Sequence, residues 1–286
     1  MGLQQSYKWL ICWSCFFFAQ VAFSAGDEQK EMVRWQGEFI QGGLIVGRLI
    51  NPDVIGVESQ GRTLQLTPEG EFVIGLGRDF KSEVEIALAM KDGSQYSFKK
   101  AVKKREYNIQ YVEGVPARTV NPSEKHLKRI RSESAKVKSA RKVTGEYAHY
   151  QGPYTWPAKG YISGVYGSQR YYNGEPKRPH FGIDIANKTG TPVYAPVSGK
   201  VVLAEGDLFY SGGTLIVDHG HGVSSSFLHL SKLHVAVGDE IKQGQLIGEI
   251  GSSGRATGPH LDWRMNWFDQ RVDPRLLMDT QSPPKK

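Results

Sequence analysis

Cysteine is nearly absent from this chain, and long apolar runs are scarce. Its two cysteines, Cys12 and Cys15, both lie within the first 25 residues, so the remainder of the chain cannot form a disulfide. No later stretch stays apolar over the ~20 residues that a membrane-spanning helix needs. Glycine, in contrast, is plentiful at 33 residues, which favours short strands and tight turns over helical bundles.

Residues 1–25 have the features of an export signal. Lys8 is their only charged residue, an apolar run covers Trp9–Ala19, and small residues at Ala22–Ala25 have the spacing that a signal peptidase needs. We predict a signal peptide over residues 1–25, and therefore export to the periplasm or cell envelope. The alternative is an anchor that stays attached, but the apolar core is short for a membrane span. The run continues past Cys15, which argues against lipidation there.

Positive charge is concentrated in the middle of the chain. The formal net charge is +7, and the run between the two candidate domains contains Arg118, Lys125, Lys128, Arg129, Arg131, Lys136, Lys138, Arg141 and Lys142. Nucleic acid is a common partner for such a run. An exported protein meets little of it, so we expect no nucleic-acid partner. We predict attraction to an anionic cell-wall or membrane surface, with a solvated linker helix as the alternative.

The sequence predicts a mainly β fold in two parts. Residues 30–114 show strands with period-two alternation, as at Thr63–Thr67, and turn residues such as Lys91–Ser94. We predict an N-terminal small β-sandwich-like domain there, of immunoglobulin-like type, with a binding or positioning role. We predict a basic helical linker over residues 115–150, with its helix beginning near Asn121. Residues 155–276 predict a C-terminal antiparallel β-sheet domain, followed by a flexible tail at 277–286.

Histidines and aspartates recur in the C-terminal part at short spacings. Seven of the eight histidines follow residue 148. His180 and Asp184 are four residues apart, and His260 and Asp262 are two apart, so each pair would share one face of a strand. His229 lies on a separate predicted strand. Three neighbouring strands could direct these five side chains to one spot, where imidazole and carboxylate groups are suitable Zn²⁺ ligands.

The order and context of these residues resemble one known family. The stretch Arg178–Ala186, the segment Gly190–Val202, the strand Phe227–Ser231 and the motif Thr257–Leu261 follow the pattern of the lysostaphin/LytM-type zinc metallopeptidases. The resemblance covers roughly residues 160 to 275. It implies a duplicated hybrid motif fold, a Zn²⁺ cofactor, and hydrolysis of peptide bonds in bacterial peptidoglycan.

The resemblance also implies roles for individual residues. His180 and Asp184 match the first two metal ligands, and His229 and His260 match the two catalytic histidines. The third ligand position holds Asp262, where the family has histidine. A carboxylate still binds zinc, but it neutralises more of the ion's charge, which weakens it as a Lewis acid. We expect metal ligation by His180, Asp184 and Asp262, and a compensating role for His221 only if its loop folds inward.

Two other functions are compatible with these patterns. Some LytM-like proteins have degenerate sites and activate a separate amidase while they bind cell wall, and Asp262 is the residue that favours this reading. A biotinyl- or lipoyl-type carrier would explain the half-barrel patterns near Gly199 and Gly238. A carrier needs a modifiable lysine at a hairpin tip, and no convincing candidate is present. The leading prediction is an exported zinc metalloendopeptidase that hydrolyses peptide cross-links of peptidoglycan in cell-wall remodelling.

Overall fold

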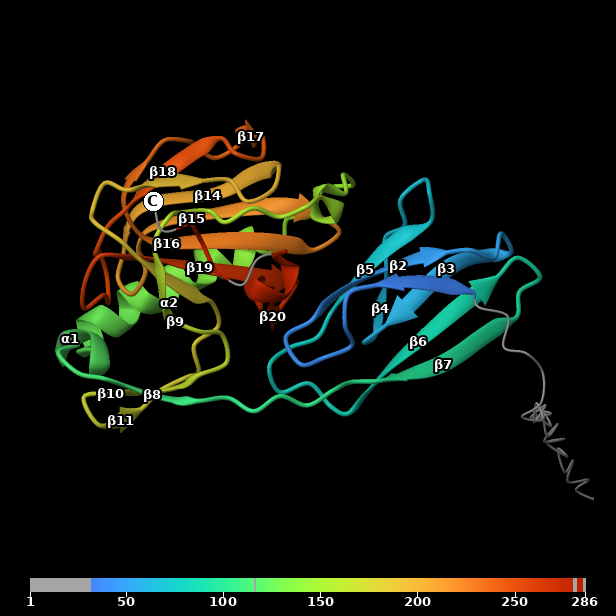
Figure 1. Ribbon diagram of the computed structural model, residues 1–286, viewed down its shortest axis with the longest axis horizontal. Coiled ribbons are helices and arrows are strands. Elements are labelled where there is room, and N and C mark those ends of the chain that lie inside the picture. Colours follow the sequence, from blue (N-terminus) through green and yellow to red (C-terminus); the bar gives the residue numbers. More distant parts are fainter. Residues whose placement is uncertain (1–31, 116, 280–281, 285–286) are drawn as a thin grey trace, which may run out of the picture. The chain divides into compact units, whose positions relative to one another are not determined.

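The computed structural model describes residues 32–115, 117–279 and 282–284. The predicted signal peptide at residues 1–25, with both cysteines, lies outside the described residues. Within the described part of the chain, no helix has the length and apolarity needed to cross a membrane. Strands dominate, and most of them pair antiparallel (Figure 1), which confirms the mainly β prediction.

The N-terminal strands form two antiparallel sheets (Figure 1). Burial alternates along one strand, where Val84, Ile86 and Leu88 are buried while Glu83 and Glu85 are exposed, so one face lies on the core. This arrangement confirms the sandwich-like prediction. The first sheet has the order β1-β2-β5, with β1 at Val33–Gln36, β2 at Leu44–Leu49 and β5 at Glu71–Gly75. The second has the order β4-β3-β6-β7, with β3 at Val54–Ser59, β4 at Arg62–Thr63, β6 at Glu83–Met90 and β7 at Gln95–Ala101.

The linker contains the predicted basic helix, α2, at Glu124–Ala140. Ala140 and Val137 pack against Leu203, Leu208 and Ile216, so one face of the helix is docked on the C-terminal sheet. Short elements surround it: β8 at Ile109–Val112, α1 at Ala117–Val120 and the 3₁₀ turn η1 at His149–Gln151. Strand β8 pairs parallel with β10 at Gln169–Tyr172, and β10 pairs with β11 at Glu175–Pro176.

The C-terminal sheet has ten strands, and its main path runs β17-β14-β15-β16-β19-β12-β9. The order places β16, β19 and β12 side by side, and these strands contain His229, Asp262 and Asp184. The path comprises β9 at Tyr161–Gly164, β12 at Ile183–Ala186, β14 at Gly199–Leu208, β15 at Gly212–Gly220, β16 at Val223–Leu233, β17 at Glu240–Ile241 and β19 at His260–Trp267. The remaining strands are β13 at Pro192–Tyr194, β18 at Leu246–Ile250 and β20 at Gln270–Val272.

The described part of the last ten residues makes packing contacts. A 3₁₀ turn, η2, spans Pro274–Leu277, and Met278 belongs to the hydrophobic core. The Gly160 amide donates a hydrogen bond of 2.9 Å to the carbonyl of Pro284. Asp273 caps the turn by accepting from the amide of Arg275.

Candidate metal centre and active site

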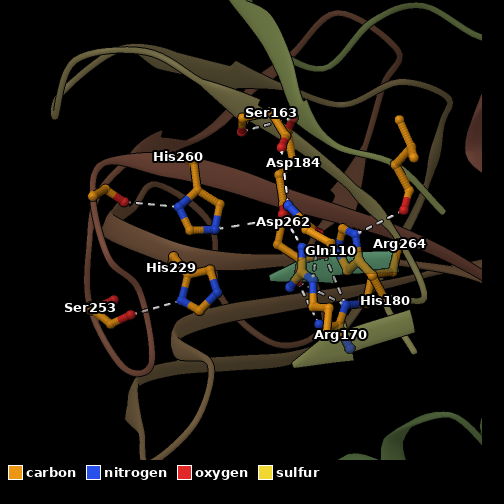
Figure 2. A network of polar contacts seen from close by, with 12 residues as sticks. Gln110, Ser163, Arg170, His180, Asp184, His229, Ser253, His260, Asp262 and Arg264 are labelled. Carbon is orange, nitrogen blue, oxygen red and sulfur yellow. Dashed lines mark hydrogen bonds and ion pairs between the residues drawn. The ribbon is translucent and has the colours of Figure 1, made fainter. Parts of the chain in front are cut away.

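Strand register brings the two aspartates together. Asp184 on β12 is the direct partner of Asp262 on β19, and Leu228 on β16 is the partner of Asp262 from the other side. Directly opposed residues in an antiparallel pair extend their side chains from the same face of the sheet. Both carboxylates therefore lie on one face, close to His229, which follows Leu228 (Figure 2).

His180 reaches the site from a different position than its spacing predicted. The four-residue interval to Asp184 suggested one strand, but β12 begins only at Ile183. The His180 amide donates to the Ser168 carbonyl at 2.8 Å, and its own carbonyl accepts from the Gly167 amide at 2.7 Å. These bonds to the 167–168 segment fix the residue before the strand, so the strand-face argument was wrong for His180.

The three predicted ligands nevertheless meet. The ligand atoms of His180, Asp184 and Asp262 all lie within 4.8 Å of one another, and all three residues are buried. The Nε2 atom of His180 lies 3.1 Å from Oδ1 of Asp184 and 3.5 Å from Oδ1 of Asp262. His180 Nε2 and Asp184 Oδ1 are buried without a hydrogen-bond partner among the residues that the structure describes.

These atoms suit a metal ion. Buried polar atoms without a partner are costly, and a cation that both atoms ligate would satisfy them. Ligands about 2 Å from a tetrahedral zinc stand roughly 3.3 Å apart, and the two separations above bracket that value. Imidazole nitrogen and carboxylate oxygen are both ordinary zinc ligands. The donor set therefore fits Zn²⁺, with His180, Asp184 and Asp262 as the residues that would hold it.

Each of the two carboxylates is bound by an arginine. Arg170 on β10 donates to Oδ2 of Asp184, which leaves Oδ1 facing His180. Arg264 on β19 donates through Nε to Oδ1 of Asp262 at 2.9 Å and to its Oδ2 at 3.1 Å. Each guanidinium orients its carboxylate, as the groups behind metal ligands commonly do, and it also offsets that carboxylate's negative charge.

The pKa values of the acidic pair reflect these contacts. Burial alone would raise the pKa of Asp184, but His180 and Arg170 outweigh it and hold the pKa well below its usual range. Burial likewise opposes ionisation of Asp262, and Arg264 and His180 outweigh it in the same way. Both groups are carboxylates at neutral pH, which is the form that binds a metal.

His229 and His260 lie beside the predicted metal ligands, and both imidazole rings have the same tautomer, with the proton on Nδ1. Their ring centroids are 4.7 Å apart. Nδ1 of His229 lies 2.7 Å from the Ser253 carbonyl (Figure 2). Nδ1 of His260 lies 2.8 Å from the Gly258 carbonyl. A carbonyl only accepts, so each Nδ1 bears the proton, and neither Nε2 makes a hydrogen bond to the residues that the structure describes. The Nε2 atom of His260 is 3.9 Å from Oδ1 of Asp184, so it points at the ligand group.

His229 is held in its basic form. Burial, followed by the effect of the neighbouring His260, lowers its pKa to about 4. Its backbone has a φ of 65°, in the left-handed region that residues other than glycine rarely adopt. The Ser211 carbonyl accepts from its amide at 2.8 Å, which holds this conformation. At neutral pH the free Nε2 can accept a proton.

The other histidines lie away from this group. His221 contacts the hydroxyl of Tyr150 and the carbonyl of Glu146, so its loop does not fold toward Asp262 and the compensating role is wrong. His219 is buried between the Ser198 carbonyl and the Ser225 hydroxyl. The remaining three pair with nearby side chains: His126 with Phe209, His149 with Tyr147 and His234 with Glu249.

Sequence reasoning missed both arginines. Arg264 carried a signal, because it follows Asp262 by two residues and so shares its strand face. Arg170 carried none, since it is 14 residues from Asp184 on a strand outside the main sheet. The loop before β15 also contributes, because Tyr210 and Ser211 line the cavity that contains His229 and His260.

The comparisons with known proteins agree with this geometry. Residues 178–274 match the model of Peptidase family M23. The peptidoglycan DD-endopeptidase ShyA of Vibrio cholerae is 41% identical over 87 residues, which is 30% of this chain and 20% of that protein. Lysostaphin of Staphylococcus staphylolyticus is 42% identical over 86 residues, 30% of this chain and 18% of the relative. The chain thus spans about a fifth of the length of these relatives.

One solved structure is similar over most of the chain. A crystal structure of a peptidase M23 from Pseudomonas aeruginosa superposes with a TM-score of 0.66 at 29% identity, and the match covers 84% of this chain and 95% of that one. This likeness includes strands outside the matched family segment. The resemblance seen in the sequence, the shared fold and the family match lead to one conclusion: residues 178–274 form a Peptidase family M23 domain.

Proposed function

We propose that this protein is a zinc metalloendopeptidase that hydrolyses peptide cross-links of bacterial peptidoglycan. The observation that carries the proposal is the grouping of three buried ligand atoms beside two histidines whose Nε2 atoms make no hydrogen bond within the described part of the chain. The relatives named as peptidoglycan and DD-endopeptidases support cross-links between stem peptides as the substrate. Hydrolysis of cell wall requires a location outside the cytoplasm, so we also propose export to the periplasm or cell envelope through residues 1–25.

The site's own residues supply most of the chemistry. Zinc, when bound, would polarise the scissile carbonyl and acidify a water molecule. His229, unprotonated at neutral pH, can accept a proton at Nε2, and the hydrogen bond from its Nδ1 to the Ser253 carbonyl fixes the ring for this role. When Nε2 of His260 bears a proton, it can donate a hydrogen bond to the oxygen of the scissile carbonyl, which becomes negative during the reaction. Arg264 and Arg170 withdraw negative charge from the two ligands, which offsets the loss of Lewis acidity expected for an aspartate ligand.

The arginines also favour a second candidate function. Two guanidiniums balance two carboxylates in the absence of any metal. A site with this balance is stable when empty, as expected of a degenerate LytM-type domain that binds cell wall and activates a separate amidase. In that case the basic residues of α2 that remain exposed would serve contact with an anionic wall or membrane surface.

Zinc content and product analysis separate the two functions. We expect purified protein to bind one zinc per chain by elemental analysis, and to release peptide fragments from purified peptidoglycan that mass spectrometry assigns to cleaved cross-links. His180→Ala should lose both zinc and cleavage. His229→Ala should retain zinc and lose cleavage. Protein that binds no zinc and releases no fragments, yet accelerates a purified amidase, would reject the peptidase and support the activator.

A further inference from the structure

The candidate site opens into a large cavity of about 1140 Å³. Its lining includes His229, His260 and Asp262 from the sheet, Val137 and Lys138 from α2, and Arg141, which caps the C-terminal end of that helix. A cavity of this size accommodates a peptide of several residues rather than a water molecule alone. Helix α2, which precedes the matched family segment, therefore supplies one wall of the space in front of the site.

That wall is firmly attached. Beyond its apolar contacts, the Glu133 carboxylate accepts from the Phe209 amide at 2.7 Å. Lys136 pairs with Glu205 at 2.9 Å, and Arg129 pairs with Asp207 at 3.1 Å. These contacts run along the helix, so the position of Arg141 at its C-terminal end is fixed relative to the sheet.

Three arginines of the cavity have no acidic partner. Arg141, Arg255 and Arg271, here called the arginine cluster, make no ion pair among the residues that the structure describes. The Nη2 atom of Arg141 donates to the Ser226 hydroxyl at 3.3 Å, and its Nε is buried without a partner in the same described set. Arg271 donates to the Asn266 side chain at 2.9 Å. Arg255 lies over the rings of Tyr172 and Tyr210, 4.7 and 4.6 Å from their centroids.

The contrast with the neighbouring arginines is informative. Arg170 and Arg264 also line the cavity, but each is bound to a carboxylate of the chain. Burial, and then the charge of Arg264, lower the pKa of Arg141 to about 10. Burial and the charges of Arg141 and Arg264 likewise lower that of Arg271. Arg141 and Arg271 therefore bear partly desolvated positive charges that are repelled by Arg264, and Arg271 is also repelled by Arg141. Arg255 is repelled by Arg264 and Arg170. An anion bound in the cavity would relieve this repulsion.

The chemistry of the cluster suits carboxylates. A guanidinium binds a carboxylate with two parallel hydrogen bonds, and such charge-assisted bonds are the strongest kind in proteins. Stem peptides of peptidoglycan bear free carboxylates next to their cross-links. We propose that Arg141, Arg255 and Arg271 form a carboxylate-binding subsite that holds the acidic stem peptide beside the cleavage site. The proposal rests on the proposed function only in taking peptidoglycan peptide as the ligand.

Binding measured without metal tests the subsite independently of cleavage. The probe is a synthetic cross-linked stem peptide with free carboxylates, compared with the same peptide fully amidated, titrated by calorimetry into zinc-depleted protein. We expect the acidic peptide to bind about 10- to 100-fold more tightly, the range for hydrogen bonds to charged groups. Arg141→Gln and Arg271→Gln should each remove most of this preference and leave the affinity for the amidated peptide unchanged.

The controls separate folding, charge and function. A misfolded variant would lose its affinity for both peptides, so binding of the amidated peptide shows that a variant is folded. Lys125→Gln removes the same charge from an exposed position on α2 outside the cavity lining, and it should keep the preference. Equal affinity of the unaltered protein for both peptides, absence of binding, or an unchanged preference in Arg141→Gln would each overturn the proposal. If the unaltered protein shows no zinc-dependent cleavage but still prefers the acidic peptide, the proposed function is refuted and the proposed subsite is not.

Discussion

Replacing Arg264 with glutamine should make the metal-free protein less stable and its zinc binding tighter. The carboxylate of Asp262 is 2% exposed, while the Arg264 side chain is 23% exposed. Removing one partner of a buried ion pair costs about 3–5 kcal/mol. Because Arg264 is partly solvated, we expect the lower end, about 3 kcal/mol, in the free energy of unfolding of metal-free protein.

Zinc would replace the lost positive charge. The penalty should therefore shrink in zinc-saturated protein, because the ion binds the carboxylate that the substitution leaves unpaired. By thermodynamic linkage, zinc affinity must rise by the same free energy, tenfold for about every 1.4 kcal/mol recovered. Urea unfolding with chelator and with excess zinc measures the two penalties. Competition with a fluorescent zinc indicator measures the affinity directly.

A matched control isolates the effect of burial. Lys99 pairs with Glu83 at 3.5 Å, and their side chains are 61% and 54% exposed. Lys99→Gln should change the free energy of unfolding by less than about 1 kcal/mol, equally with and without zinc. Our reasoning is refuted if Arg264→Gln loses the same stability in both conditions, or if it binds zinc more weakly than the unaltered protein.

Two further predictions concern other parts of the domain. Burial lowers the pKa of His219 from 6.5 to about 4, so the folded state binds fewer protons than the unfolded state in that interval, and stability falls as pH drops from 6.5 to 4. His219→Asn should remove about 3 kcal/mol of this pH dependence in urea unfolding. If the free energy of unfolding of the variant still falls as steeply between pH 6.5 and 4, His219 is not the group responsible. Gly164→Ala would place a Cβ against Oδ2 of Asp184 and near Arg170, so zinc affinity should fall at least about tenfold while circular dichroism shows an intact fold. Unchanged affinity would mean that the carboxylate can shift without consequence.

The site was partly predictable because its main residues follow strand geometry. His260 and Asp262 are two residues apart on β19, so they share one face of the strand. Their placement beside β12 and β16 follows from the short turns and antiparallel pairing of the region. His180 was assigned to the right cluster for the wrong reason. Its spacing matched a strand, but its backbone bonds go to Ser168, and a non-local bond of this kind leaves no local pattern.

The helix and its role were harder to predict. The basic run of α2 predicted a linker helix correctly, and charge dominates its composition. Its docking face depends on a few apolar residues, Val137 and Ala140, which meet Leu203 and Leu208 only in the folded chain. The same holds for Arg141, which forms no ion pair with any residue that the structure describes. Composition shows that an arginine is present, but only the structure shows what surrounds it.

The docking of α2 bears on how this domain can be exchanged or trimmed. A fragment cut to residues 178–274 keeps all five residues of the predicted site but loses Val137, Ala140 and Arg141. It would expose Leu203 and Leu208 to water and leave the cavity open on one side. Grafting this segment into a relative would thus transfer the residues proposed for catalysis without one wall of the cavity. In this protein, a fragment that keeps this wall of the cavity must begin no later than the helix, some fifty residues before the family segment.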